Sequence, residues 1–263
     1  MIWGAAVISH QASEKRLIER ELDHRSLVVA GLPYYYQVHL NKLCNQKCIM
    51  CMPDGRHPRD EMPLERFVAF FKQIRPFAEH ITLIGGEPLM YRWIDEVLEM
   101  LSKTTIAVTT ITNATALTER VAQRLLSLHE LNLRCSIDAA TQTTYLKVHG
   151  TNHFDRVATQ VRRFSDLAQT KASIRLIMHF VVMRENLGEV LSFVDFAKAY
   201  RPHRVEFHPV RHVSNWNVDN DTGWEFRGSE QSCEAFKAEY NEVMRAAKAK
   251  CEAEGVPYEV VLL

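Results

Sequence analysis

The stretch Leu-Cys-Asn-Gln-Lys-Cys-Ile-Met-Cys-Met-Pro-Asp, residues 43–54, holds three of the six cysteines in this chain of 263 residues. Cys44, Cys48 and Cys51 form a C-x-x-x-C-x-x-C array. Such short gaps let one loop turn all three sulfurs inward with little further loss of chain entropy. A [4Fe–4S] cluster usually takes four thiolates. Since the sequence has no fourth cysteine nearby, such a cluster would keep one iron open, as a catalytic metal site must be.

A structural zinc site is a second interpretation of the same cysteines. Tetrahedral zinc takes four protein ligands, and the fourth would come from His57, Cys135 or Cys233. Thiolate softness suits both zinc and iron–sulfur clusters. The cysteine array alone therefore leaves both kinds of site open.

A second motif supports the cluster. Ile81-Thr82-Leu83-Ile84-Gly85-Gly86-Glu87-Pro88 is an apolar strand that leads directly into two glycines, an acid and a proline. With the cysteine array before it, in this order and at about this separation, the chain resembles the radical S-adenosylmethionine (SAM) enzymes. The combination is far more specific than either motif alone.

Two further segments extend the resemblance, which covers residues 36 to about 212. Thr112-Asn113-Ala114-Thr115 is similar to a Thr-Asn-Gly-Thr segment of the family, with Ala114 in place of glycine. Ser136-Ile137-Asp138-Ala139-Ala140-Thr141 resembles a segment of members that carry a C-terminal SPASM or twitch extension. Those relatives bind auxiliary clusters through later cysteines, and this chain shows no such array.

The resemblance implies roles for single residues. Cys44, Cys48 and Cys51 would hold a [4Fe–4S] cluster whose open iron is chelated by SAM. The glycines would let the backbone approach SAM closely, and the acid would accept from its ammonium group. The residues implied in SAM binding are Met50, Gly85, Gly86, Glu87, Pro88, Asn113, Ser136, Asp138, His149 and Val210.

Some of these residues have a plain structural alternative. Met50 suits a place beside adenine or in the core, and Asn113 suits the ligand or a turn. Relatives often have arginine where His149 stands, so the carboxylate contact there should be weaker or different. His39, His179 and His208 fall on expected strands, where they either line the pocket or are core histidines.

The remaining pattern predicts an α/β fold, a partial (β/α)6 TIM-like barrel with parallel strands. Functional residues of such a sheet gather beyond the carboxyl ends of its strands, where all the motifs above fall. Expected strands are 33–41, 80–84, 106–112, 131–137, 173–183 and 204–210, and expected helices are 11–22, 62–74, 91–102, 118–127, 141–148, 154–168 and 186–200. The predicted division is an N-terminal extension over 1–32, a radical SAM core over 33–212, and a C-terminal part over 213–263.

The C-terminal part is expected to hold a loop over 214–228, a helix over 229–254 that ends at Gly255, and a strand over 256–263. From the apolar end Val260-Val261-Leu262-Leu263 we expect the sequence to continue, and the resemblance implies a SPASM or twitch domain there. This stays an expectation about the parent protein.

Composition narrows the partners. Lysine plus arginine and aspartate plus glutamate number 32 each, so no strong field favours nucleic acid or an anionic membrane. No apolar run reaches the ~20 residues needed to cross a bilayer, and the cysteine usage favours a reduced, cytoplasmic location.

The resemblance implies an enzyme that reductively cleaves SAM to a 5′-deoxyadenosyl radical, which abstracts hydrogen from a substrate. An electron donor such as flavodoxin or ferredoxin would supply the electron. The substrate is expected to be a peptide or protein side chain rather than a small metabolite. The alternative is a non-catalytic iron–sulfur or zinc module for electron transfer or scaffolding, which leaves Gly85 to Pro88 without a role.

Overall fold

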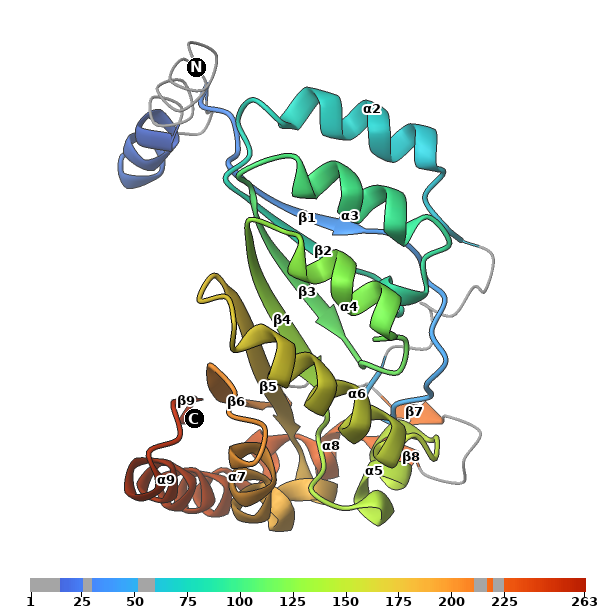
Figure 1. The fold of residues 1–263 in the computed structure, drawn as a ribbon. Helices are drawn as coiled ribbons and strands as arrows, with labels where there is room; N and C mark the ends of the chain where they lie inside the picture. The colour runs from blue at the N-terminus through green and yellow to red at the C-terminus, as the bar shows by residue number, and fades with distance from the viewer. Residues whose placement is uncertain (1–14, 26–29, 52–59, 211–216, 220–224) are drawn as a thin grey trace.

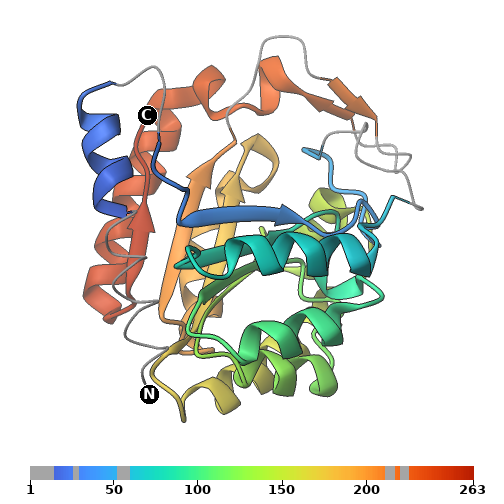
Figure 2. The ribbon, with the colours of Figure 1, turned by 90° about the horizontal axis from the view of Figure 1, so that it is seen from above.

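A curved sheet of parallel strands organises the computed structural model, which describes residues 15–25, 30–51, 60–210, 217–219 and 225–263 (Figure 1). Each pair of neighbouring strands runs parallel. The seven strands, in sheet order, are β1 (Tyr35–His39), β2 (His80–Ile84), β3 (Ala107–Thr112), β4 (Glu130–Ser136), β5 (Ile174–Val182), β6 (Arg204–Pro209) and β9 (Tyr258–Val260). The sheet curls without closing (Figure 2), which confirms the expected partial barrel.

Helices connect the strands and cover one face of the sheet (Figure 1). In α2 the buried residues Phe67, Phe71 and Ile74 recur at helical spacing and form one apolar stripe. The helices that follow β1 are α2 (Leu64–Ile74), α3 (Ile94–Ser102), α4 (Glu119–Leu126), α5 (Gln142–His149), α6 (Phe154–Ala168), α7 (Val190–Lys198), α8 (Gly228–Gln231) and α9 (Lys237–Glu254). Short 3-10 turns are η2 (Pro88–Met90), η3 (Arg184–Glu189) and η4 (Cys233–Phe236).

The two faces of the sheet differ in polarity. Leu131, Leu133 and Cys135 of β4 are fully buried in the main apolar core. The alternate residues of the same strand, including Arg134 and Ser136, are only partly buried. Because strand side chains alternate between faces, we call the face that carries Arg134 and Ser136 the inner face.

The C-terminal part departs from expectation in two places. Within the expected loop 214–228, β7 (Asn217–Asp219) and β8 (Glu225–Arg227) form an antiparallel pair, whereas 214–216 and 220–224 lie outside the described residues. The prediction of a single helix over 229–254 is wrong, because the segment is divided into α8, η4 and α9. The break falls at Ser232, whose extended ψ of 134° a helix cannot accommodate.

The final strand joins the main sheet. The segment expected over 256–263 forms β9, which pairs with β6 in the register Val205 to Tyr258 and Phe207 to Val260. The sheet therefore has a strand beyond the six of the expected barrel core. Gly255 ends α9 in the left-handed conformation, with φ of 65°, as expected.

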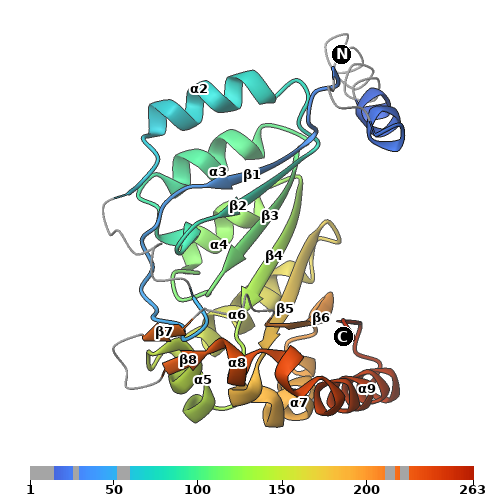
Figure 3. The same ribbon diagram turned by 180° about the vertical axis from the view of Figure 1, so that it is seen from behind.

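The expected N-terminal helix is described only in part, since residues 15–23 are helical and its start lies outside the described residues. Lys15 pairs with Glu79 at 2.8 Å, which attaches this segment to the turn before β2. None of the described helices combines the length and apolar composition that a bilayer-crossing helix needs. Figure 3 shows β7, β8 and α8 crossing the end of the sheet where the strands finish.

Candidate active site

The cysteine loop is fastened to the last turn of α5. The backbone N–H of Lys47 donates to the carbonyl of His149, and that of Ile49 donates to the carbonyl of Val148, both at 2.9 Å. Carbonyls in the last turn of a helix lack partners within the helix, so they are available to the loop. Gly150 caps the helix with φ of 64°.

The other side of the loop lies against the glycine pair. The N–H of Gly86 donates to the carbonyl of Asn41 at 2.9 Å, and the N–H of Glu87 donates to the carbonyl of Leu43 at 2.6 Å. A Cβ atom would lie 2.4 Å from the Asn41 oxygen at Gly85 and 2.3 Å from the Leu43 oxygen at Gly86. Two backbones in direct contact therefore require glycine here.

Glu87 is fully buried and turns its carboxylate toward the protein. Oε1 accepts hydrogen bonds from the Leu89 N–H at 3.0 Å and the Thr112 hydroxyl at 2.6 Å, and Oε2 accepts from the Asn113 N–H at 2.7 Å. Burial raises the pKa of this carboxyl to about 7, and the three donors act in the opposite direction. Glu87 thus connects the ends of β2 and β3.

Asn113 forms a turn, and its side chain also contacts the cysteine loop. Its Oδ1 accepts from the Thr115 N–H at 2.9 Å, while its Nδ2 donates to Cys44 Sγ at 3.6 Å and to Asn45 Oδ1 at 3.1 Å. Ala114 follows with φ of 58°. That left-handed conformation favours glycine, which is the residue expected at this position from the family.

Asp138 is buried at the end of β4 with φ of 54°. Its Oδ1 accepts from the Val181 N–H at 2.6 Å, and its carbonyl accepts from Asn186 Nδ2 at 2.9 Å. Oδ2 is buried and has no hydrogen-bond partner among the described residues. Burial raises the pKa of this carboxyl to about 7.

His149 touches one of the cysteines. Its Nδ1 lies 3.1 Å from Cys48 Sγ, and its Nε2 lies 2.9 Å from the carbonyl of Ile137. Burial lowers the pKa of the ring to about 4. A neutral ring that donates from Nε2 to a carbonyl keeps a lone pair on Nδ1. The 3.5 Å approach to Asp138 is therefore not an ion pair.

These elements surround one pocket of about 280 Å³ at the carboxyl ends of the strands. The residues predicted from the sequence that line it are Cys44, Cys48, Met50, Cys51, Gly85, Gly86, Asn113, Ser136, Asp138 and His149. Five lining residues were not predicted: Gln46, Ile84, Ile111, Thr112 and Val181. Three of these residues, Ile84, Ile111 and Thr112, could have been predicted to line the pocket because they stand at the ends of expected strands.

Three predicted residues do not line the pocket. Glu87 faces the protein, as described above, and Pro88 begins η2. Val210 packs with Ile49, Val148 and Met183 in a small apolar cluster beside the loop. A direct SAM contact for these three stays a prediction.

The donor set of the pocket fits an iron–sulfur cluster. Cys44, Cys48 and Cys51 all line it. Burial raises the pKa of Cys44 to about 11, so metal binding there would have to release a proton. Of the expected fourth zinc ligands, Cys135 and Cys233 do not line the pocket, and His57 lies outside the described residues.

Sulfur spacing also bears on the choice of metal. Cys44, Cys48 and Cys51 all belong to the described residues, and at least two of their sulfur atoms lie more than 4.8 Å apart. A tetrahedral zinc with bonds of about 2.3 Å would hold its sulfurs about 3.8 Å apart. The array is therefore wider than a single zinc ion requires.

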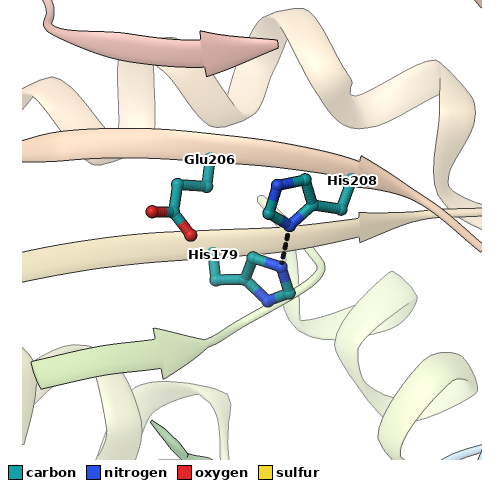
Figure 4. A group of neighbouring side chains, drawn as sticks. All are labelled: His179, Glu206 and His208. Carbon is teal, nitrogen blue, oxygen red and sulfur yellow. Dashed lines mark hydrogen bonds between the residues drawn. The ribbon is translucent and has the colours of Figure 1, made fainter. Parts of the chain in front are cut away.

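A second group of ligand-type side chains lies on the inner face (Figure 4). The group consists of His179, Glu206 and His208, each of which has one ligand atom within 4.8 Å of those of the other two. His179 Nε2 is 2.9 Å from His208 Nδ1. However, Arg134 and Arg204 pair with the Glu206 carboxylate at 2.8 and 2.5 Å. Two guanidinium groups would repel a divalent cation, so this group is a polar network rather than a metal site.

An open parallel α/β barrel with a three-cysteine loop and a pocket at its strand ends defines a class of cofactor-binding barrel proteins. Within that class, residues 39–197 match the family model of the radical SAM superfamily. The chain belongs to the radical SAM superfamily.

Curated relatives include GTP 3′,8-cyclases. One from Vibrio cholerae is 26% identical over 187 residues, covering 66% of this chain and 53% of that protein. A probable GTP 3′,8-cyclase from Saccharolobus islandicus is 25% identical over 179 residues, covering 66% of this chain and 57% of that protein. The chain thus spans little more than half the length of these relatives.

Solved structures of the same fold include a Streptococcus suis protein, SuiB bound to S-adenosylmethionine, with a TM-score of 0.71 and 14% identity over 95% of this chain and 54% of SuiB. Another is anSMEcpe with bound AdoMet, with a TM-score of 0.63 and 15% identity over 86% of this chain and 64% of that protein. At these identities the likeness concerns the fold alone.

Proposed function

We propose that this chain is the core of a radical SAM enzyme in which Cys44, Cys48 and Cys51 hold a [4Fe–4S] cluster and the adjoining pocket holds SAM. The observation that carries the proposal is the convergence of the three cysteines, the glycine pair and the ends of β3 and β4 on one pocket. The bound cluster and SAM would supply the chemistry, which is reductive cleavage of SAM to a 5′-deoxyadenosyl radical that abstracts hydrogen from the substrate.

The pocket wall offers the two kinds of surface that SAM requires. Met50 and Val181 supply apolar area suited to adenine, whereas Ser136, Asp138 and Asn113 supply polar atoms suited to the ribose and the amino-acid end. The protein's contribution is to bind and orient the cofactor and to keep water out. A small electron-transfer protein such as flavodoxin or ferredoxin would deliver the electron.

The substrate is proposed to be a peptide or protein side chain. A nucleoside triphosphate would call for an excess of cationic groups, but the arginines on the described inner face are matched by carboxylates. The pairs are Arg175 with Glu130 at 2.5 Å, Arg134 with Glu206 at 2.8 Å and Arg204 with Glu259 at 3.5 Å. A balanced face suits a polar substrate without net charge, and SuiB has been solved bound to its precursor peptide SuiA.

The test is anaerobic reconstitution with iron and sulfide, followed by dithionite and SAM. The expected products are 5′-deoxyadenosine and methionine, measured by chromatography. They should be lost in Cys44→Ala, Cys48→Ala and Cys51→Ala. Cys251→Ala, which removes a buried thiol of α9, is the matched control and should retain both products.

Two other results would contradict the proposal. An intact cluster that never yields 5′-deoxyadenosine would favour the non-catalytic iron–sulfur module, and a stoichiometric zinc bound by the three cysteines would favour a structural site. Consumption of added GTP under the same conditions would overturn the peptide preference while leaving the cofactor assignment in place.

A further inference from the structure

Glu189, at the end of η3, holds the N-terminus of α5. Its Oε2 accepts from the N–H groups of Ala140 and Thr141 at 2.6 and 3.2 Å, and its Oε1 accepts from the hydroxyls of Thr141 and Thr144 at 2.5 and 2.7 Å. The N–H groups at the start of a helix lack internal partners and favour a negative charge nearby. One carboxylate therefore accepts four hydrogen bonds at this end of the helix.

Helix α5 needs such anchoring because it is a weak helix by itself. It has eight residues, Gln-Thr-Thr-Tyr-Leu-Lys-Val-His, of which three are β-branched. Helices this short are marginal in water, and β-branched residues lower the helix propensity further. Its position must come from tertiary contacts.

The far end of α5 is where the cysteine loop is fastened. Besides the two backbone hydrogen bonds to Lys47 and Ile49, the ring of His149 contacts Cys48 and the hydroxyl of Tyr145 accepts from Gln46 Nε2. A helix of eight residues spans about 12 Å. It links Glu189 at one end to the cysteine loop at the other.

The turn η3 also holds the end of β4. Asn186, from the same turn as Glu189, donates to the carbonyl of Asp138 at 2.9 Å. Ala140, which Glu189 binds, lies two residues after Asp138. The η3 turn therefore fixes the pocket wall at Asp138 and, through α5, the cysteine loop opposite it.

We infer that Glu189 is a positioning residue for the cofactor site: it acts through α5 to set the cysteine loop against the pocket wall, without touching the cofactors. This inference rests on the proposed function, because it concerns the cluster and SAM. Loss of a supporting contact behind a metal site typically costs 10–100-fold in affinity or activity.

The decisive variant is Glu189→Gln, which nearly keeps the shape but removes the negative charge and replaces one acceptor oxygen with a donating N–H₂ group, so that either the two N–H groups lose an acceptor or the hydroxyls of Thr141 and Thr144 must turn to accept. Glu185→Gln is the matched control, because Glu185 lies on the same turn and also contacts α5, through a single pair with Lys147 at 3.1 Å. A second series is Thr144→Val, which removes one donor, and Thr144→Ser, which retains it.

The measurements, on anaerobically reconstituted protein, are iron and sulfide per chain, the electron paramagnetic resonance spectrum of the reduced cluster with and without SAM, and the Kd for SAM. We expect Glu189→Gln to weaken SAM binding about tenfold or more and to broaden the SAM-dependent spectral change. Glu185→Gln and Thr144→Ser should match the unchanged chain, and Thr144→Val should fall between.

Thermal unfolding of the same substitutions in a Cys44→Ala, Cys48→Ala, Cys51→Ala background separates positioning from folding. An unchanged spectrum and Kd in Glu189→Gln would overturn the inference while leaving the proposed function intact. So would a loss of SAM binding that a loss of folded protein fully explains. If the unsubstituted chain binds neither cluster nor SAM, the proposed function and this inference both fail.

Discussion

The backbone N–H of Asn113 donates a hydrogen bond of 2.7 Å to Oε2 of Glu87, which ties the end of β3 to the end of β2. Because the other oxygen of Glu87 is taken by Leu89 and Thr112, this acid organises the pocket from behind. Its neighbours Gly85 and Gly86 are the part of the motif that lines the pocket. A direct contact of Glu87 with SAM would require this buried carboxylate to become accessible from the pocket.

Glu87→Ala is expected to destabilise the fold by about 3 kcal/mol, because three buried donors lose their acceptor and each unsatisfied group costs roughly 1–3 kcal/mol with partial relaxation. Urea unfolding of the metal-free chain measures the loss. Glu99→Ala, which removes an exposed pair with Lys103, should stay within about 0.5 kcal/mol. Equal losses in the two variants would show that Glu87 has no structural role.

Gly86→Ala is expected to abolish stable attachment of the cysteine loop, because the new methyl would lie 2.3 Å from the Leu43 oxygen and 2.5 Å from the Lys42 oxygen. Iron bound per chain after reconstitution measures the effect. Gly188→Ala is the control, since a Cβ there meets no atom of the described residues within 4 Å. Full iron loading in Gly86→Ala would mean that the two backbones can separate without consequence.

Substitutions of Ala114 test the left-handed backbone conformation between Asn113 and Thr115. Its φ of 58° costs a non-glycine residue about 1 kcal/mol, while its buried methyl contributes about 0.8 kcal/mol. Ala114→Gly should therefore change the free energy of unfolding by less than about 1 kcal/mol. Ala114→Val should lose more than about 2 kcal/mol, because a β-branched residue resists this φ and overfills the core. Comparable stability of the glycine and valine variants would contradict the assigned conformation.

The buried ring of His179 is expected to make the free energy of unfolding depend on pH. Burial, with smaller effects of His208 and Arg134, lowers the pKa of His179 from 6.5 to about 3. Between pH 3 and pH 6.5 the unfolded chain therefore binds more protons than the folded chain. The contribution of His179 to the free energy of unfolding is complete above pH 6.5 and is lost as the pH falls toward 3. From pH 7.5 to 5.0 the unchanged chain should lose about 2 kcal/mol more than His179→Asn. Parallel stability curves for the two proteins would show that folding does not shift the pKa of this ring.

Regular hydrophobic patterns were sufficient to predict much of the fold. The strand expected over 80–84 is β2, and the helix expected over 154–168 is α6, with the same boundaries. Both segments carry a local period that matches their element. The C-terminal helix was mispredicted because the break at Ser232 depends on packing against Val210, whose carbonyl accepts from the Cys233 N–H at 3.2 Å.

The candidate site shows the same division. Cys44, Cys48 and Cys51 are predictable because their spacing is local and their chemistry is specific. The contact between Cys48 and His149 joins residues 101 positions apart. No local pattern encodes which way a side chain turns at that separation.

The sequence by itself therefore determined the class of fold, the order of its elements and the residue types gathered at the strand ends, because period and spacing are properties of neighbouring residues. The tertiary structure alone decided that Glu87 faces inward, that Glu189 anchors α5 and that β9 completes the sheet edge beside β6. These outcomes depend on hydrogen bonds and packing between distant segments, which exist only once the chain has folded.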